Sequence, residues 1–171
     1  MRTVCFHGVE STGKSVLAAK LAAELGCPWV PEYGREYCEE HGTDLTMADL
    51  LAIAEGEARS IERAKASAPD LLLLDTDQLM TAAWAQMLFG EVPPALMEYP
   101  KADLYLHFAP DVPWVDDGTR FFGTPESRAE FDRAARAALT DAGVVPIEIA
   151  GDWEEREAEV RAALSQLCAA P

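Results

Sequence analysis

Gly8-Val9-Glu10-Ser11-Thr12-Gly13-Lys14-Ser15 is a complete phosphate-binding loop, and it follows the apolar run Val4-Cys5-Phe6. Glycine at both ends lets the backbone curl until successive N–H groups point inward at phosphate oxygens, with the N-terminus of a helix behind them. Such a loop requires a strand before it and a helix after it. Residues 3–6 are β-prone and residues 16–25 repeat leucine at helical spacing, so the stretch predicts the start of an α/β fold.

The loop also indicates a nucleotide and a metal ion. Lys14 is placed to reach the β- and γ-phosphates and the Ser15 hydroxyl to ligate Mg²⁺, so ATP and Mg²⁺ are the expected cofactors. The residues expected to contact the nucleotide are Gly8, Glu10, Ser11, Thr12, Gly13, Lys14, Ser15, Val16 and Arg120. The alternative, a glycine-rich turn with an incidental lysine, does not account for the flanking strand and helix.

The composition limits the class of protein. A chain of 171 residues suits one domain, residues 1–171, and 49% hydrophobic residues exclude general disorder. The 30 acidic residues against 14 lysines and arginines give a net charge of −16, which repels nucleic acid and anionic membranes. Without a signal-peptide pattern or a long apolar run, the expected location is the cytoplasm, where the four cysteines stay reduced. No apolar stripe indicates an oligomer interface.

Apolar runs alternate with helical periods along the rest of the chain. Strands are expected at residues 3–6, 27–30, 71–74, 104–108 and 144–149, and helices at residues 16–25, 46–66, 79–89 and 154–167. Thr46 with Asp49 resembles a capping box, and the four leucines at 71–74 are typical of a strand buried on both faces. Strands separated by helices predict a five-stranded parallel sheet with helices on both faces. Residues 110–125 are polar and turn-rich, which predicts a short lid.

Polar residues at the carboxyl ends of the strands are the candidates for chemistry, because ligands of open α/β sheets bind there. Asp75 stands where a carboxylate holds the Mg²⁺ shell; capping of the next helix is the alternative, and Asp77 suits that task better. Glu32 is the first candidate for the carboxylate that takes a proton from an acceptor hydroxyl, and Asp77 or Asp75 is the second. A surface ion pair between Glu32 and Arg35 is the alternative interpretation.

A cation for the transferred phosphoryl group is expected from the lid. Arg120 is the first candidate and Arg128 the second. The expected catalytic set is therefore Lys14, Glu32, Asp75 and Arg120. Arg128 belongs to a predicted helix whose charges, with Asp132 and Arg136 among them, are mostly expected to form a solvated face.

Four motifs occur in the order found in NadR-like P-loop kinases. They are the phosphate loop, Glu32-Tyr33-Gly34-Arg35-Glu36, Asp75-Thr76-Asp77, and Trp114-Val115-Asp116-Asp117-Gly118 followed by Arg120. Over essentially its whole length, the chain resembles this family, the ribosylnicotinamide kinase domain of bacterial NAD metabolism. The resemblance implies a three-layer P-loop NTPase fold with nucleoside-kinase strand order and a lid. It also implies an ATP-dependent kinase that phosphorylates the ribose 5′-hydroxyl of nicotinamide riboside.

The resemblance further implies an acceptor site. The residues expected there are Trp29, Glu32, Tyr33, Arg35, Asp77, Trp114 and Asp117. The family typically has an aromatic residue directly before the Glu-Tyr-Gly-Arg-Glu motif, where this chain has Pro31, so Trp29 is either a ring-stacking residue or part of the core. No H-x-G-H-type nucleotidyltransferase signature occurs in the sequence. The alternatives are a kinase for another nucleoside or small metabolite, and an ATPase switch without a small-molecule acceptor.

Overall fold

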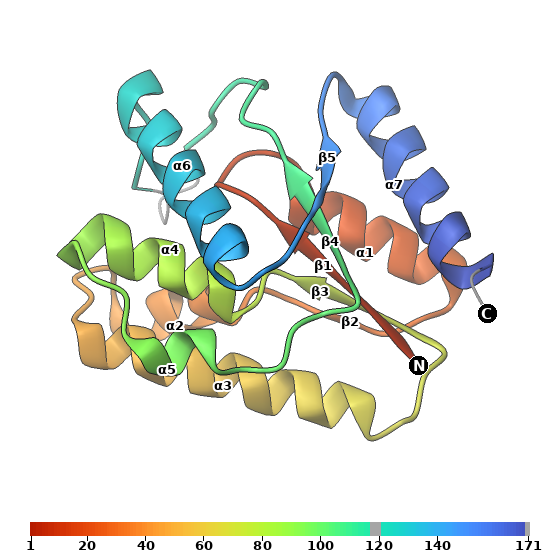
Figure 1. Cartoon of the computed structure of the whole chain (residues 1–171), viewed down its shortest axis with the longest axis horizontal. Coiled ribbons are helices and arrows are strands. Elements are labelled where there is room, and N and C mark those ends of the chain that lie inside the picture. The colour runs from red at the N-terminus through yellow and green to blue at the C-terminus, as the bar shows by residue number, and fades with distance from the viewer. Residues whose placement is uncertain (117–120, 170–171) are drawn as a thin grey trace.

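One parallel sheet organises the chain (Figure 1). The structure, a computed structural model, describes residues 1–116 and 121–169. In these residues the strands are β1 (Arg2–His7), β2 (Trp29–Val30), β3 (Leu71–Asp75), β4 (Leu104–Phe108) and β5 (Ile147–Ile149), in the spatial order β2-β3-β1-β4-β5. The helices are α1 (Lys14–Leu25), α2 (Tyr33–His41), α3 (Met47–Lys65), α4 (Gln78–Phe89), α5 (Pro94–Met97), α6 (Pro125–Asp141) and α7 (Trp153–Ala169). The predicted α/β class and the five-stranded parallel sheet are confirmed.

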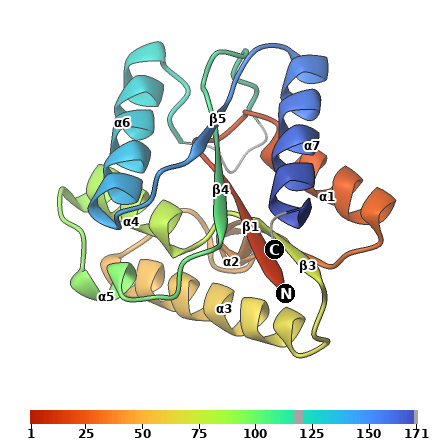
Figure 2. The same cartoon turned by 45° about the vertical axis from the view of Figure 1, so that its right-hand side comes forward.

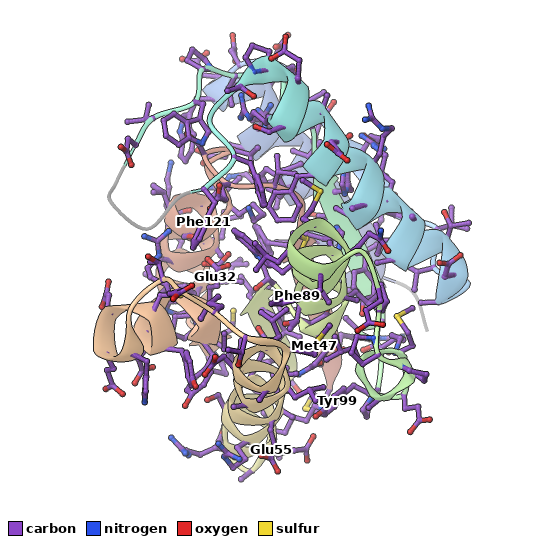
Figure 3. The ribbon with its side chains drawn as sticks, turned by 90° about the vertical axis from the view of Figure 1, so that its left-hand side faces the viewer. Glu32, Met47, Glu55, Phe89, Tyr99 and Phe121 are labelled. Carbon is purple, nitrogen blue, oxygen red and sulfur yellow. The ribbon has the colours of Figure 1, made fainter. Side chains whose placement is uncertain are left out.

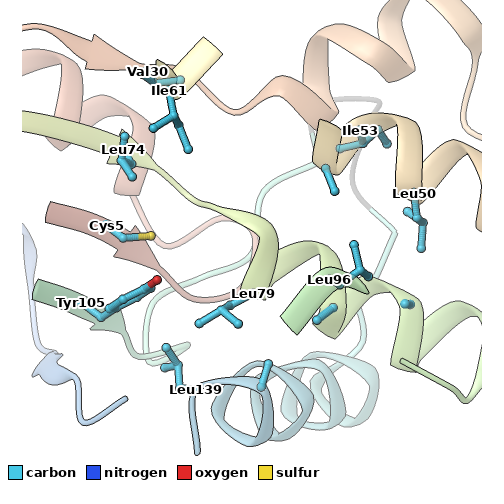
Figure 4. Packing of buried hydrophobic residues seen from close by; sticks show 14 of the residues in the cluster. Cys5, Val30, Leu50, Ile53, Ile61, Leu74, Leu79, Leu96, Tyr105 and Leu139 are labelled. Atoms are coloured by element: carbon cyan, nitrogen blue, oxygen red, sulfur yellow. The ribbon is translucent and has the colours of Figure 1, made fainter. Parts of the chain in front are cut away.

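Helices cover both faces of the sheet (Figure 2). On one face, α1 and α7 bury a cluster that contains Leu17, Val160, Val4, Phe6, Leu71 and Leu73. On the other face, α3, α4 and α6 bury a cluster that contains Cys5, Leu50, Leu72, Leu74, Leu79, Tyr105 and Leu139 (Figure 4). Successive side chains of a strand point to opposite faces, so a strand covered on both faces needs apolar residues at every position.

Two strands are shorter than predicted, and a proline explains each difference. β2 covers residues 29–30 rather than 27–30, because Pro28 has no N–H to donate to a ladder. β5 covers residues 147–149 rather than 144–149, and Pro146 stands directly before it. The capping box is confirmed: the Asp49 N–H donates to Thr46 Oγ1, and the Thr46 N–H donates to the Asp49 carboxylate at 2.7 Å. Among the described residues, no helix combines the length and the apolarity that crossing a membrane requires.

The segment after β2 contains α2, a helix that is absent from those predicted from the sequence. It docks on α3 through Tyr33, whose ring covers Gly56. A Cβ at Gly56 would lie 2.0 Å from Cε1 of this ring. The missing side chain of Gly56 therefore sets how closely α2 approaches α3, and so where the residue just before α2, Glu32, is held.

Gly56→Ala is expected to destabilise the protein by about 1–3 kcal/mol, the usual cost of overpacking a core. In a helix free of such contact, the same substitution stabilises by roughly 0.5–1 kcal/mol, so the sign of the change is diagnostic. Urea unfolding of wild type, Gly56→Ala, Tyr33→Ala and the double variant measures the effect. In the Tyr33→Ala background, Gly56→Ala should no longer lower the free energy of unfolding. A Gly56→Ala single variant that is more stable than wild type would contradict the contact between Gly56 and Tyr33.

Candidate active site

The phosphate loop connects β1 to α1 and is shaped by two glycines. Gly8 has a φ of +122°, and a Cβ there would lie 2.7 Å from the carbonyl oxygen of Phe108 in β4. Gly13 has a φ of +86°, and a Cβ there would lie 3.0 Å from the ring of Trp153. Both positions require glycine, because a side chain would combine a strained backbone with a close contact.

The side chain of Lys14 lies inside the loop. It is 7% exposed, and its Nζ donates to the carbonyl oxygen of Val9 at 2.7 Å. Thr12 Oγ1 donates to the same carbonyl at 3.0 Å. The ammonium is thus held beside the curled backbone, where the phosphates of a nucleotide bind in loops of this kind.

Strand β3 ends on Asp75, next to the start of α1. Asp75 is 2% exposed and is hydrogen-bonded to the Ser15 side chain. Its Oδ1 is buried and has no hydrogen-bond partner in the part of the chain that the structure describes. Burial raises the pKa of Asp75, and the Lys14 ammonium opposes that shift. An unsatisfied carboxylate oxygen next to a hydroxyl suits Mg²⁺, which prefers oxygen ligands, so these residues fit the expected ion.

Asp77 serves the fold instead of the site. Its Oδ1 accepts from the Leu79 N–H at 3.0 Å and caps α4, while its Oδ2 accepts from the Tyr105 hydroxyl. Between the two aspartates, Thr76 has a φ of +72°, a conformation that β-branched residues rarely adopt. The acceptor contact and the base role expected for Asp77 are therefore corrected: both of its oxygens are engaged in the core.

Glu32 lies just before α2 and lines a cavity of about 300 Å³ beside the phosphate loop (Figure 3). Removal from water and the neighbouring Asp75 carboxylate raise the pKa of Glu32 to about 7, against the opposing effect of Lys14 and Arg35. A carboxylate with a pKa near neutrality is suited to accept a proton during a reaction. Glu32 and Arg35, for which a surface ion pair was the alternative interpretation, both line the cavity.

The cavity joins the phosphate loop to an apolar compartment. The eight residues between Gly8 and Val16 that are predicted to contact the nucleotide line it, and the ninth, Arg120, lies outside the described residues. Its apolar wall is formed by Leu45, Leu50, Ile53, Met80, Trp84, Phe121 and Phe131. Figure 3 shows Phe121 and Glu32 on the same side of the molecule. A cavity of this composition accommodates phosphates at one end and a flat, weakly polar ring at the other.

Three aromatic residues expected at the acceptor site lie elsewhere. Trp29 packs with the cluster beneath α1 and α7, so it belongs to the core on the face opposite the cavity. Tyr33 covers Gly56, and Trp114 lies against Gly123 in a second, separate cavity. The aromatic lining comes instead from Trp84, Phe121 and Phe131, which the sequence analysis missed. Asp117 and Arg120 lie outside the described residues.

The described parts of the predicted lid lie against the phosphate loop. The Glu10 carboxylate accepts hydrogen bonds from the backbone N–H groups of Phe121 and Phe122, at 3.2 and 3.4 Å. Ser11 Oγ accepts from the Val115 N–H at 2.8 Å. Two loop residues thus position the chain on either side of residues 117–120.

Two buried arginines brace the loop from outside the cavity. Arg128 of α6, 8% exposed, donates to the carbonyl oxygens of Val112 at 2.5 Å and Ser11 at 3.2 Å. Arg156 of α7, 1% exposed, donates to Thr12 O at 3.2 Å and pairs with Asp111. The prediction that the charges of α6 form a solvated face is therefore wrong for Arg128. The pattern of charges along this helix does not indicate that the guanidinium is buried.

Asp132 on the same helix is also tied to the sheet. Its carboxylate accepts from Nε2 of His107 in β4 at 2.9 Å and from Arg136 at 2.8 Å. His107 in turn shares a 3.0 Å hydrogen bond with His7, the residue before Gly8. Asp132 thus connects α6 to the strand that leads into the phosphate loop, which corrects its expected place on a solvated face.

A phosphate loop after β1, a buried aspartate at the end of β3 and a cavity between them define a P-loop nucleotide-binding protein. Comparison with known sequences agrees with this class. The chain belongs to the AAA domain family, whose sequence profile matches residues 3–156.

Two curated relatives carry the same name, Trifunctional NAD biosynthesis/regulator protein NadR. The protein of Escherichia coli (strain K12) is 37% identical over 138 residues, and that of Salmonella typhimurium (strain LT2) is 36% identical over 138 residues. In each case the match covers 77% of this chain and 34% of the relative. The chain therefore corresponds to about a third of the length of these relatives.

Solved structures share the fold. The crystal structure of NadR protein in complex with NR has a TM-score of 0.82 and 24% identity, covering 99% of this chain and 50% of that chain. The complex of NadR with NAD and AMP-PNP has a TM-score of 0.79 and 22% identity, covering 99% and 50%. The thymidylate kinase of Ehrlichia chaffeensis has a TM-score of 0.68 and 14% identity, covering 95% and 98%. The predicted P-loop fold of the nucleoside-kinase type is confirmed.

Arg128→Met, which removes the guanidinium but keeps much of the apolar stem, is expected to destabilise the protein by roughly 1–3 kcal/mol, because buried carbonyl groups lose their donors. It should also weaken MgATP binding, since the loop loses one of its braces. Thermal unfolding and titration calorimetry measure the two effects. Arg133→Met, an exposed arginine of the same helix, is the matched control. Equal thermal stability and equal MgATP affinity of the two variants would contradict the proposed role of Arg128 in holding the loop.

Proposed function

We propose that this protein is an ATP-dependent kinase that transfers the γ-phosphate of ATP to the ribose 5′-hydroxyl of nicotinamide riboside. The observation that carries the proposal is the continuous cavity in which Lys14 and the phosphate loop face Glu32, with an aromatic wall beyond. The curated relatives are NAD biosynthesis proteins by name, and the solved NadR structures contain NR in one case and AMP-PNP in another. The names of the relatives and the ligands of the NadR structures support ATP and nicotinamide riboside as the substrates, and the cavity is consistent with both.

In this reaction the phosphate loop binds the phosphates of ATP, and Lys14 contacts the β- and γ-phosphates. Ser15 and Asp75 would hold Mg²⁺, which when bound neutralises charge on the phosphate oxygens. Glu32 accepts the proton of the 5′-hydroxyl as that oxygen bonds to the γ-phosphorus and the bond to ADP breaks. Arg35 lines the same part of the cavity, and Arg120 is proposed to supply a further cation.

The predicted lid is expected to close over this site. Ser11 and Glu10 hold Val115 and Phe121 against the phosphate loop by hydrogen bonds, and closure would exclude water from the transferred group. We further propose a cytoplasmic location, because ATP, the proposed phosphate donor, is abundant there. The net charge of −16 disfavours nucleic acid as a general partner.

The first experiment is MgATP turnover with and without nicotinamide riboside, next to a panel of other nucleosides. Nicotinamide riboside should stimulate ADP formation and yield its mononucleotide. Lys14→Ala should abolish turnover in a protein that still folds, because the cation on the β- and γ-phosphates is lost. Stimulation by another nucleoside alone would reassign the acceptor, and acceptor-independent hydrolysis would favour an ATPase switch.

The pH profile tests Glu32. Because the base must be deprotonated and its pKa is raised to about 7, kcat/KM should fall as the pH drops below about 7. Glu32→Gln should lose at least roughly 100-fold in kcat and lose this acidic limb. Glu36→Gln, an exposed carboxylate of α2, is the control. An unchanged acidic limb in Glu32→Gln would assign proton transfer to another group.

A further inference from the structure

A second carboxyl group lines the acceptor end of the cavity and has no part in the mechanism above. Glu57 of α3 is 3% exposed. It shares a helix face with Leu50 and Ile53, which also line the cavity, and with Ile61 of the core. An ionisable residue therefore occupies a position in this stripe where the helical period predicts an apolar one.

The hydrogen bonding of Glu57 is incomplete. Its Oε1 accepts a long hydrogen bond of 3.4 Å from the Thr76 hydroxyl. Its Oε2 is buried and finds no partner among the residues that the structure describes. A buried carboxyl with an unsatisfied oxygen is unfavourable for folding, so a ligand in the cavity that pairs with this oxygen would recover free energy on binding.

The surroundings of Glu57 are negative. Burial is the largest cause of its raised pKa, and the carboxyl groups of Asp77, Glu32 and Asp75 raise it further. Lys14 and Arg35 are the cationic side chains in the described lining, and both oppose the rise in the pKa of Glu32 and of Asp75. A raised pKa favours the neutral carboxyl in the empty cavity, whereas a cation bound beside Glu57 lowers this pKa and favours the carboxylate. A ligand with a positive charge therefore suits this compartment.

The aromatic wall favours the same kind of ligand. Trp84 lies with its ring centroid 4.7 Å from that of Phe131 and 5.2 Å from that of Phe121, and all three rings line the cavity. Aromatic faces attract a cation through their quadrupole, and they also stack on a flat ring. Carboxyl and rings together suit a flat cationic ring.

We propose that Glu57 is the specificity-determining residue that selects a ribosylated ring with a positive charge over a neutral base. The assignment rests on the proposed function, in which the acceptor is nicotinamide riboside, whose pyridinium ring is cationic. Glu57 binds through its unsatisfied oxygen and takes no part in the phosphoryl transfer. Its removal should thus change which acceptor is preferred and leave the chemical step intact.

The test compares two acceptors that differ in ring charge. Nicotinamide riboside is cationic, and 1,4-dihydronicotinamide riboside is neutral with the same carboxamide and ribose hydroxyl groups. In wild type, kcat/KM should favour the cationic form. In Glu57→Gln this preference should fall by roughly tenfold or more, mainly through KM, because a buried charge pair loses one partner. Glu57→Met, which fits the apolar stripe, should show the same loss.

The control is Glu55→Gln, the same change on the solvent side of α3, where the Glu55 side chain is 70% exposed (Figure 3). Its preference should equal that of wild type. A wild-type ratio in Glu57→Gln, or an equal loss for both acceptors, would overturn the assignment of Glu57 and leave the kinase proposal intact. Failure of wild type to phosphorylate either riboside would instead overturn the proposed function.

Discussion

The close approach of Gly8 to the backbone of β4 is the contact on which the site depends. A Cβ at Gly8 would lie 2.7 Å from a carbonyl oxygen, so the chain leaves β1 by a route that only glycine permits. Three cationic side chains then donate hydrogen bonds to carbonyl oxygens of the loop. Lys14 donates to Val9, Arg128 to Ser11 and Arg156 to Thr12. Helices α6 and α7, far apart in the sequence from the loop, thereby fix its shape.

Carboxyl groups from three parts of the chain lie in or beside the cavity: Glu32 before α2, Glu57 on α3 and Asp75 at the end of β3. Burial raises the pKa of all three, and neighbouring carboxyl groups raise the pKa of Glu32 and Glu57 further, whereas Lys14 opposes the shift of Asp75. Such a cluster is unfavourable for stability, since buried acids repel one another and lose hydration. Perturbed carboxyl groups gathered in one cavity are typical of functional sites, where folding stability is given up for binding and chemistry.

The elements that the sequence predicted well are those with a strong local signal. The phosphate loop, the buried strand at 71–74 and the capping box of Thr46 with Asp49 all occur as expected, because each depends on residues close together in the chain. The strand ends at Pro28 and Pro146 were misjudged, although proline is itself a local signal for a ladder that cannot continue. Trp29 was the harder case: the face of a two-residue edge strand is set by its pairing with β3 rather than by its own pattern.

By itself, the sequence determined that this is an α/β nucleotide-binding protein with a phosphate loop, a strand-end aspartate and Glu32 as the candidate base. The spacing of the motif is sufficient for this prediction. The two glycines, together with the strand before and the helix after, determine the backbone geometry of the eight-residue phosphate loop. Only the tertiary structure decided that Arg128 and Arg156 brace the loop, that Tyr105 engages the second oxygen of Asp77, and that Glu57, Trp84, Phe121 and Phe131 line one cavity. Those contacts join residues of different helices and loops, and their distances are set by how the helices pack on the sheet.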